Sequence, residues 1–279
     1  MIKIENFEVV GLERAIRGMR NPMNSWNKSD SNVCAYSKHT LHCKDCEYAG
    51  MCNADEKDIE TNYIVGPEDH DLMMKLRNAG TDHRKYLRMI TVYLDITAPL
   101  YWWKEFDTYK VGTVANSCST MHKIHEKEFT LDDFSCEHLD EVSVTILEDV
   151  INHINDMRAW FNEIDNQLKN DELSQEKIIE LCELKKDKWW QMIQLLPSSY
   201  NQRRTIMLNY EVLANMYKSR KGHKLDEWRL HDAPSDPRGH TKDFASGVWG
   251  FCDWIESLPY SEIITGNAKK LVWGDYQPC

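Results

Sequence analysis

The chain has 279 residues, 42% of them hydrophobic and 28% charged, with ten Trp and twelve Tyr. This is the composition of an ordered globular protein, and the length fits one large domain over residues 1–279. The net charge is −11, and no Lys/Arg block is long enough to follow a phosphate backbone, so we expect no nucleic acid partner. A single nucleotide stays compatible with this charge, because a few local cations suffice to bind one phosphate.

Neither a signal peptide nor a membrane span is expected. The N-terminal stretch MIKIENFEVV lacks an apolar core, and no apolar run approaches the ~20 residues that cross a bilayer. Nine cysteines, an odd number, favour metal ligation or reduced thiols over the disulfide framework of a secreted protein. We therefore expect a cytoplasmic protein that does not contact a membrane.

Short strands and helices are expected to alternate in the first half of the chain. In order, they are a strand over residues 4–10, a helix over 12–19, a polar loop over 21–60, a short helix over 72–76, a strand over 86–96 and a helix over 100–110. Asn21-Pro22 ends the first helix, because the residue before a proline disfavours helical geometry. Pro99 breaks the second strand and stands near the first turn of the next helix, where proline costs least.

The second half of the chain is predicted to be mainly helical. Apolar residues recur at intervals of three and four at Ile146, Val150, Ile154, Met157, Phe161, Ile164 and Leu168. Further helices are expected over residues 174–196, 203–221 and 243–258, and a loop over 232–240. Together these elements indicate an α+β fold with a helix-rich C-terminal half.

Four cysteines lie close together in a polar stretch, residues 32–60. Cys34, Cys43, Cys46 and Cys52 have the spacing C-x8-C-x2-C-x5-C, in which the central pair can place two thiolates on one metal and the others complete a tetrahedral set. Zinc is the default for a small structural site, and an iron-sulfur cluster also fits the spacing. The alternative is four reduced thiols in a loop. We expect a small Cys-rich insertion that binds a metal.

The stretch LLPSSYNQRRTIMLNYEVLANMYKSRKGHKLDEWR, residues 195–229, resembles the C-terminal active-site segment of the flavin-dependent thymidylate synthases. That family has a Leu-Pro, an arginine a few residues later, an Asn that begins a helix, an arginine later in that helix and a last arginine. The matching residues here are Leu196-Pro197, Arg203, Asn209, Arg220 and Arg229.

A second stretch, residues 80–121, is similar in the order of its elements to the part of that family that carries the signature R-H-R-x-x-S-x-N-E-x-S-x-R. The matching residues, 108–121, read TYKVGTVANSCSTM and lack most of the signature's charges. Lys110 is the one cation left where the family has R-H-R, and Thr113 keeps the first hydroxyl. Met121 takes the place of the last arginine.

Which residue takes the place of the signature's second serine stays open. With one residue inserted upstream, Asn116 and Ser119 keep the spacing N-x-x-S, whereas an ungapped match puts Cys118 there. A Cys118 thiolate is a candidate nucleophile, but a cysteine between two serines is more often a small packing residue. Both residues are therefore candidates.

The resemblance implies a role for each matched residue. Arg203 would hold the nucleotide phosphate, Asn209 would lie against the flavin or the nucleotide, and Arg229 would face the pyrimidine ring. The full candidate set is Arg229, Arg220, Ser119 and Cys118 for catalysis; Arg203, Arg204, Glu105, Ser117 and Arg229 for the nucleotide; and Lys110, Thr113, Asn116, Asn209, Arg88 and Tyr109 for the flavin.

Physical reasoning supports the phosphate role of Arg203 and Arg204 separately. Both lie at the start of the helix expected over residues 203–221, where free backbone N–H groups and the helix dipole favour an anion. The alternative is that adjacent arginines at such a place are solvated surface charges.

By resemblance, the protein would methylate C5 of dUMP to give dTMP, with methylenetetrahydrofolate as the carbon donor and NADPH-reduced FAD as the source of the hydride. The family's mixed α/β fold and a homotetramer with shared active sites are implied as well. The protein would position planar ligands, while Arg220 and Arg229 stabilise negative charge on the pyrimidine. Candidate stacking surfaces are Tyr101, Trp102, Trp103 and Tyr109, with core packing as the alternative for the two tryptophans.

Two other functions stay open. The changed signature permits a related enzyme that methylates or hydroxymethylates another nucleotide such as dCMP, because discrimination on the ring rests on a few hydrogen bonds. It also permits a protein that binds a nucleotide without catalysis.

Overall fold

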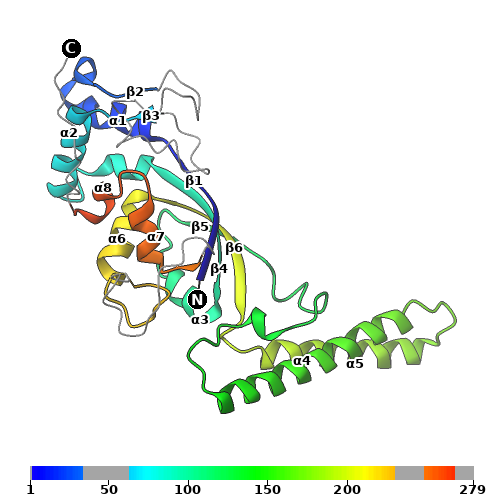
Figure 1. Ribbon diagram of the computed structural model, residues 1–279. Coiled ribbons are helices and arrows are strands. Elements are labelled where there is room, and N and C mark those ends of the chain that lie inside the picture. Colours follow the sequence, from blue (N-terminus) through cyan, green and yellow to red (C-terminus); the bar gives the residue numbers. More distant parts are fainter. Residues whose placement is uncertain (1, 34–62, 230–247, 268–279) are drawn as a thin grey trace, which may run out of the picture. The chain divides into compact units, whose positions relative to one another are not determined.

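A computed structural model describes residues 2–33, 63–229 and 248–267 (Figure 1). These residues form a mixed fold of helices and sheets, as the sequence indicates. The described residues divide into two compact units: unit 1 contains residues 97–106 and 117–204, and unit 2 contains residues 2–33, 63–96, 107–116, 205–229 and 248–267. The expectation of a single domain over the whole chain stays a prediction.

Each unit has its own set of elements. Unit 2 contains β1 (Ile2–Val10), α1 (Leu12–Arg20), the 3-10 helices η1 (Asn21–Met23) and η2 (Trp26–Lys28), β2 (Asn32–Val33), β3 (Tyr63–Ile64), α2 (Pro67–Asn78), the 3-10 helix η5 (Lys85–Met89), α6 (Tyr210–Arg220), β7 (Val248–Trp249), α7 (Phe251–Ser257) and α8 (Glu262–Thr265). Unit 1 contains α3 (Leu100–Phe106), the 3-10 helix η6 (Leu131–Asp133), α4 (Glu141–Gln167) and α5 (Gln175–Leu195). Three strands contribute residues to both units: β4 (Thr91–Pro99), β5 (Val114–Ser117) and β6 (Asn201–Asn209).

The larger sheet has the strand order β5-β6-β4-β1-β7. Strand β7 is antiparallel to β1, with Ile2 opposite Trp249 and Lys3 opposite Val248. Strands β2 and β3 form a separate antiparallel pair. The order brings β6, from late in the chain, beside β4 from its first half, so the two stretches that resemble one family supply neighbouring strands.

The N-terminal strand and helix form as predicted. Ile2 and Ile4 of β1 are buried on one face, and α1 ends where Asn21-Pro22 follows it. Gly11 joins the two elements with φ of +96°, a left-handed conformation that glycine adopts without strain. A side chain at Gly11 would collide with the carbonyl oxygen of Met89, so the close approach of this turn to η5 requires glycine.

Helix α2 is longer than the short helix expected over residues 72–76. Pro67 stands in its first turn, and the carboxylate of Asp30 accepts hydrogen bonds from the backbone N–H groups of Glu68 at 2.8 Å and Asp69 at 3.1 Å. Because this cap comes from 38 residues upstream of Glu68, the local pattern does not reveal where the helix begins.

The strand expected over residues 86–96 was wrong in its first part. Residues 85–89 form η5, and the strand begins at Thr91. Tyr86, Leu87 and Ile90 are buried with a helical spacing, and the Tyr86 hydroxyl donates to the carbonyl oxygen of Met73 at 2.8 Å. From Thr91 the buried residues alternate, as a strand requires. The helix after Pro99 forms as predicted but ends at Phe106 rather than near residue 110.

The helix expected over residues 203–221 was also wrong in its first part. Residues 201–209 form β6, in which Gln202, Ile206 and Leu208 are buried and Arg203 is exposed. Helix α6 starts only after Asn209, whose side chain accepts a hydrogen bond from the N–H of Val212. The alternating burial explains the correction: a strand precedes the cap.

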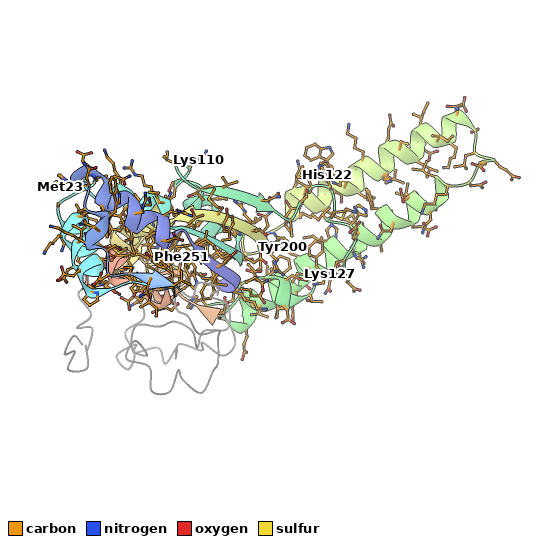
Figure 2. The ribbon with its side chains drawn as sticks, turned by 90° about the horizontal axis from the view of Figure 1, so that it is seen from above. Met23, Lys110, His122, Lys127, Tyr200 and Phe251 are labelled. Carbon is orange, nitrogen blue, oxygen red and sulfur yellow. The ribbon has the colours of Figure 1, made fainter. Side chains whose placement is uncertain are left out.

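Helices α4 and α5 of unit 1 confirm the predicted helical stretches and pack side by side (Figure 1). Asp140 and Ser174 cap their first turns with side-chain acceptors. The buried face is slightly rotated from the expected one, because Leu147 and Ile151 are buried while Ile146 is 59% exposed. Tyr200, labelled in Figure 2, lies edge-on to Phe129 and Phe134 of the same core.

The helix expected over residues 243–258 is shorter among the described residues. Strand β7 occupies residues 248–249, and α7 begins at Phe251 after Gly250. Phe251, labelled in Figure 2, is fully buried, with its ring 5.3 Å from that of Trp228. The loop expected over residues 232–240 lies outside the described residues. Of the helices that are described, none has the length and apolar character needed to cross a membrane.

Candidate functional site

The candidate residues fall into two groups, one in each unit. Unit 2 holds Arg88, Tyr109, Lys110, Thr113, Asn116, Asn209, Arg220 and Arg229. Unit 1 holds Glu105, Ser117, Cys118, Ser119, Arg203 and Arg204. The four candidate metal ligands, Cys34, Cys43, Cys46 and Cys52, lie outside the described residues, so the expected metal site stays a prediction. In the described part of the chain, no cluster of His, Cys, Asp and Glu could hold a metal ion.

Arg220, the last residue of α6, contacts three other residues of unit 2. Its Nε donates a hydrogen bond to the hydroxyl oxygen of Tyr109 at 2.9 Å, and its Nη1 lies 2.9 Å from Nε2 of His223. The guanidinium carbon is 5.6 Å from the ring centre of Tyr109 and 5.1 Å from that of Trp228, which is fully buried. These contacts hold a partly buried cation between two aromatic rings. We call these four residues the Arg220 cluster.

Gly112 brings the loop after α3 against the start of α6. Its φ is +80°, and a Cβ there would lie 2.9 Å from the Nδ2 of Asn209 and 3.2 Å from the Cγ2 of Val212. The side chain of Asn209 caps α6 through its oxygen. The expectation that an Asn begins this helix is therefore confirmed, and glycine at position 112 leaves room for the Asn209 amide.

The other candidates of unit 2 differ in exposure. Lys110 is exposed at the edge of the unit, as Figure 2 shows, and Asn116 and Arg88 are exposed as well. The hydroxyl of Thr113 is buried and has no hydrogen-bond partner in the part of the chain that the structure describes. Arg229 is partly exposed and pairs with the buried Asp226, whose Oδ1 is 3.7 Å from its Nη1.

Burial and charge make this part of unit 2 suitable for a planar ligand that carries anionic groups. A buried hydroxyl without a partner, that of Thr113, is a polar atom that a bound group would satisfy. Lys110 supplies an exposed cation, and the half-buried ring of Tyr109 supplies an apolar surface backed by the Arg220 guanidinium.

In unit 1, Arg204 is held by two contacts from the same core. Its guanidinium lies over the ring of Trp103 with 4.2 Å to the ring centre, and its Nε donates to Oε1 of Gln202 at 3.0 Å. Gln202 in turn donates through Nε2 to the carbonyl oxygen of Cys118 at 2.9 Å. Trp103 donates through Nε1 to the carbonyl oxygen of Gln202, also at 2.9 Å. Buried Gln202 therefore ties β6 to the stretch after β5 and orients the arginine.

The predicted basis for an anion site at Arg203 and Arg204 was wrong, because both lie in β6 rather than at a helix N-terminus. No helix dipole acts there. The backbone carbonyl of the exposed Arg203 accepts from the N–H of Cys118 at 2.9 Å, which places Cys118, directly after β5, beside β6. Arg203 and Arg204 are consecutive residues of β6, so their side chains point to opposite faces of the sheet, and only that of Arg204 is oriented by the contacts described above.

Cys118 and Ser119 both lie on the surface of unit 1. Cys118 is a free, exposed cysteine. The hydroxyl oxygen of Ser119 accepts hydrogen bonds from the N–H groups of Met121 at 3.2 Å and His122 at 3.0 Å, which closes a local turn. Ser117 is the last residue of β5 and Cys118 follows it directly; both are exposed, and half-buried Glu105 lies on α3.

The four aromatic candidates for stacking differ in burial, which separates core packing from a surface available to a ligand. Trp102 and Trp103 are buried at 0% and 1% exposure and pack edge-to-face with ring centres 4.8 Å apart, so core packing accounts for both. Trp103 also carries Arg204 on its face. Tyr101 and Tyr109 stay partly exposed.

Sequence reasoning missed His223, Trp228, Gln202 and Gly112. Trp228 stands directly before the matched Arg229, and a tryptophan near matched arginines is a signal for a stacked cation. Gly112 interrupts a stretch that otherwise has the pattern of a strand, and an isolated glycine at such a place indicates a close approach of the backbone to another group. Gln202 carries no comparable local signal.

The chain was compared with known proteins. No family model and no curated protein matches it. A crystal structure of flavin-dependent thymidylate synthase from Helicobacter pylori, complexed with FAD and dUMP, is similar over 80% of this chain and 85% of its own, with 14% sequence identity and a TM-score of 0.45. A second crystal structure, of thymidylate synthase X from the same organism with FAD and dUMP, covers 94% of each chain with 14% identity and a TM-score of 0.48.

Proposed function

We propose that this chain is a flavin-dependent enzyme that methylates C5 of a pyrimidine deoxynucleotide, with dUMP as substrate and dTMP as product. Methylenetetrahydrofolate is the carbon donor, and FAD reduced by NADPH supplies the hydride. The observation that carries the proposal is the Arg220 cluster, in which Tyr109 meets Arg220 and Trp228. Tyr109 belongs to the stretch that resembles the family signature, and the other two belong to the stretch that resembles its C-terminal segment.

The residues of unit 2 around the Arg220 cluster bind FAD in this proposal. Lys110 and Arg88 offer exposed cations for its diphosphate, and the Thr113 hydroxyl and the Asn116 amide offer hydrogen bonds to polar atoms. Tyr109 offers a ring for stacking, and Asn209 keeps its Nδ2 available beside Gly112 while its oxygen caps α6. When bound, the flavin supplies the hydride that completes the methyl group.

The nucleotide contacts come from three arginines in this proposal. Arg203 and Arg204 are assigned to the phosphate, as the resemblance implies; Arg204 is oriented by Trp103 and Gln202, whereas Arg203, its neighbour on β6, projects from the opposite face of the strand. Arg229 stabilises negative charge that develops on the pyrimidine ring, and its partner Asp226 keeps it in place until substrate binds. Glu105, Ser117, Cys118 and Ser119 are the further polar candidates on unit 1.

The altered signature favours a second candidate function. Thr108, Tyr109 and Met121 stand where the family has arginine or histidine, so the ligand contacts on this side differ from the family pattern. A changed set of hydrogen bonds is how an enzyme of this kind would accept dCMP instead of dUMP. The same change would also suit a protein that binds a nucleotide without catalysis.

Two further parts of the proposal rest on sequence alone. Cys34, Cys43, Cys46 and Cys52 bind a zinc ion or an iron-sulfur cluster, and the chain assembles as a homotetramer in the cytoplasm. Elemental analysis of the purified protein tests the metal. Sedimentation velocity tests the assembly, and a monomer would contradict it.

The visible spectrum of the purified protein tests the flavin. We expect flavin absorbance that NADPH bleaches and that returns when dUMP and methylenetetrahydrofolate are added, with dTMP as the product by chromatography. The variant Arg220→Met should lose bound flavin, whereas Arg14→Met, at an exposed position of unit 2, should keep it. A colourless protein that FAD does not reconstitute would contradict the proposal. Turnover of dCMP without turnover of dUMP would establish the second candidate.

A calorimetric titration tests the phosphate site. Replacing Arg203 by Ala should weaken dUMP binding by about 1.5–3 kcal/mol, the range for a hydrogen bond to a charged group. The control Arg17→Ala changes an arginine of α1 in unit 2, and it should leave binding unchanged. Equal affinities in Arg203→Ala and the parent protein would remove Arg203 from the site.

A further inference from the structure

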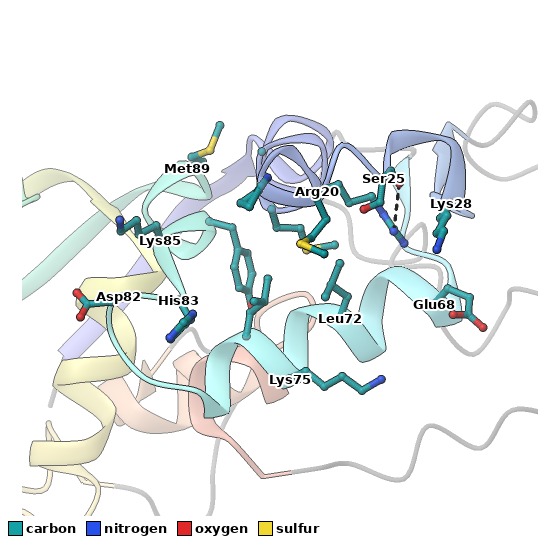
Figure 3. Close-up of a pocket in the computed structure, with 16 residues that line it drawn as sticks. Arg20, Ser25, Lys28, Glu68, Leu72, Lys75, Asp82, His83, Lys85 and Met89 are labelled. Carbon is teal, nitrogen blue, oxygen red and sulfur yellow. Dashed lines mark hydrogen bonds between the residues drawn. The ribbon is translucent and has the colours of Figure 1, made fainter.

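A cavity of about 690 Å³ lies in unit 2 between α1, α2 and η5 (Figure 3). Its volume is in the range of sites for small organic ligands, about 300–1,000 Å³. The apolar residues that line it are Met19, Met23, Leu72, Leu76, Tyr86 and Met89. None of the residues assigned above to the nucleotide or the flavin lines it, so this cavity is separate from the site proposed for those ligands.

One wall of the cavity is fixed by a buried ion pair. The Nε of Arg20 lies 2.6 Å from Oδ1 of Asp69 on α2, and both side chains are at most 5% exposed. The second oxygen of Asp69 accepts hydrogen bonds from the hydroxyls of Ser29 and Ser31, each at 2.6 Å. The Nη1 of Arg20 reaches the carbonyl oxygen of Ser25 at 3.4 Å (Figure 3). This network holds residues 21–31 against α2, so the cavity is formed before a ligand arrives.

A second part of the wall depends on a glycine inside a helix. Gly18 lies inside α1, where glycine stabilises a helix less than alanine does. A Cβ at Gly18 would lie 2.9 Å from the sulfur of Met89, so the glycine lets this thioether lie over the helix. Met89 is nevertheless 45% exposed, and Met23 is 81% exposed. Unbranched, polarisable methionine side chains adapt to the shape of an apolar ligand.

The rim of the cavity is cationic in a protein whose net charge is −11. Lys28, Lys75 and Lys85 line it, and the two carboxylates that also line it belong to Glu68 and Asp82. Arg20 is neutralised by Asp69, so one net positive charge remains without counting His83. Over the ranges 2–33, 63–229 and 248–267, none of the three lysines forms an ion pair. An anionic group would therefore find ammonium partners at the edge of an apolar floor.

We propose that this cavity binds a small amphipathic anion, a molecule with a hydrocarbon body and one carboxylate head. The hydrocarbon lies on the floor of Met19, Leu72 and Leu76, and the head is bound by the lysines of the rim. Burial of the apolar surface of the hydrocarbon favours binding. Ion pairs between the lysine ammonium groups and the carboxylate favour binding of a charged head over an uncharged one.

Decanoate is a suitable probe, with binding to the full-length protein followed by isothermal titration calorimetry. We expect one site per chain, with affinity at least tenfold lower for butyrate, whose hydrocarbon chain is much shorter, and for 1-decanol, which lacks the charge. The triple variant Lys28→Met, Lys75→Met, Lys85→Met should bind decanoate at least tenfold more weakly. The same three changes to Arg keep the charge and should keep the binding.

Two further variants separate this site from non-specific adsorption. Met89→Glu places a carboxylate at the cavity wall and should weaken binding at least tenfold, whereas Lys186→Met, at an exposed position of α5, should change nothing. Circular dichroism and thermal unfolding establish that each variant is folded. Equal affinity in the Met and Arg triple variants, or binding to phosphatidylglycerol vesicles without binding of monomeric decanoate, would overturn the proposal. Both outcomes are measured without flavin or nucleotide, so failure of this proposal is distinguishable from failure of the proposed function.

Discussion

The Nε of Arg220 donates a hydrogen bond to the hydroxyl oxygen of Tyr109 at 2.9 Å, which joins the end of α6 to the loop after α3. Tyr109→Phe removes the acceptor and keeps the ring. We expect the free energy of unfolding to fall by about 1–3 kcal/mol, because the part-buried guanidinium loses a partner. Binding of FAD should weaken as well. Urea unfolding and a flavin titration measure the two effects.

Tyr93→Phe is the matched control for this change. Tyr93 is 45% exposed on β4, so loss of its hydroxyl should alter stability by less than about 0.5 kcal/mol. If Tyr109→Phe behaves like this control in both measurements, the Arg220 cluster is a surface contact without a role in the site.

Gly112→Ala should destabilise unit 2 for two separable reasons. The φ of +80° strains any side chain, and the new Cβ would lie 2.9 Å from the Nδ2 of Asn209. We expect a loss of about 1–3 kcal/mol in the free energy of unfolding. Gly80→Ala is the first control: Gly80 also has a positive φ, +111°, but a Cβ there would meet no atom, so this variant measures the backbone strain alone. Gly222→Ala is the second control, because a Cβ at Gly222 would meet no atom and the residue has no positive φ. A loss at Gly112 no larger than that at Gly80 would exclude the contact with Asn209.

Asn209 has a structural role that any functional test must separate. Its side chain accepts from the N–H of Val212, so Asn209→Ala should lower stability by about 0.5–2 kcal/mol. Asn209→Ser keeps a capping oxygen and should restore most of this loss while lacking the amide. If Nδ2 contacts flavin, the Ser variant is stable but binds FAD more weakly than the parent. A Ser variant with unchanged FAD affinity would leave Asn209 as a cap alone.

Periodicity in the sequence predicted those elements whose signals are local. Helices α4 and α5 follow an apolar repeat of three and four with their own caps, and β1 and α1 end at local signals. The start of α2 was missed because its cap, Asp30, comes from elsewhere in the chain. Strand β6 was taken as helix because it runs directly into α6, and only the alternation of Gln202, Ile206 and Leu208 marks the boundary.

The candidate site was predictable to a different extent. The matched arginines were found from their order after Leu196-Pro197; the separations of Asn209 from Pro197 and of Arg220 from Asn209 match the family, and the step to Arg229 is one residue shorter. The partners of those arginines were not found, since Tyr109 is 111 residues from Arg220 and pairs with it only through tertiary structure. Long-range pairs of this kind depend on the order of the strands in the sheet, which a local sequence pattern does not predict.

Ile154 of α4 is completely buried in the core of unit 1. Ile154→Ala should lower the free energy of unfolding by about 2–5 kcal/mol, since the change removes buried methyl groups and leaves a cavity. Ile146→Ala is the control on the same helix, because Ile146 is 59% exposed and should cost little. Chemical denaturation followed by far-ultraviolet circular dichroism measures both. Similar losses in the two variants would contradict the assigned buried face.

Asp69 links the stability of unit 2 to acid pH. Burial raises the pKa of its carboxyl group, but the hydrogen bonds from Ser29 and Ser31 and the charge of Arg20 outweigh this and lower the pKa below 3.8. A lowered pKa in the folded state means that the carboxylate stabilises the fold at pH values above its unfolded pKa. This contribution is lost as the pH falls through the folded pKa.

Asp69→Asn should therefore destabilise the protein most at neutral pH, by about 3–5 kcal/mol, because it leaves the buried guanidinium of Arg20 without its counter-charge. The difference between the variant and the parent should shrink as the pH falls below about 4, where the parent loses the same charge. Asp71→Asn, at an exposed position of α2, is the control and should show no such trend. Urea unfolding at pH 7, 5, 4 and 3 measures the differences. A constant difference between Asp69→Asn and the parent over that range would show that the carboxyl of Asp69 does not titrate with folding.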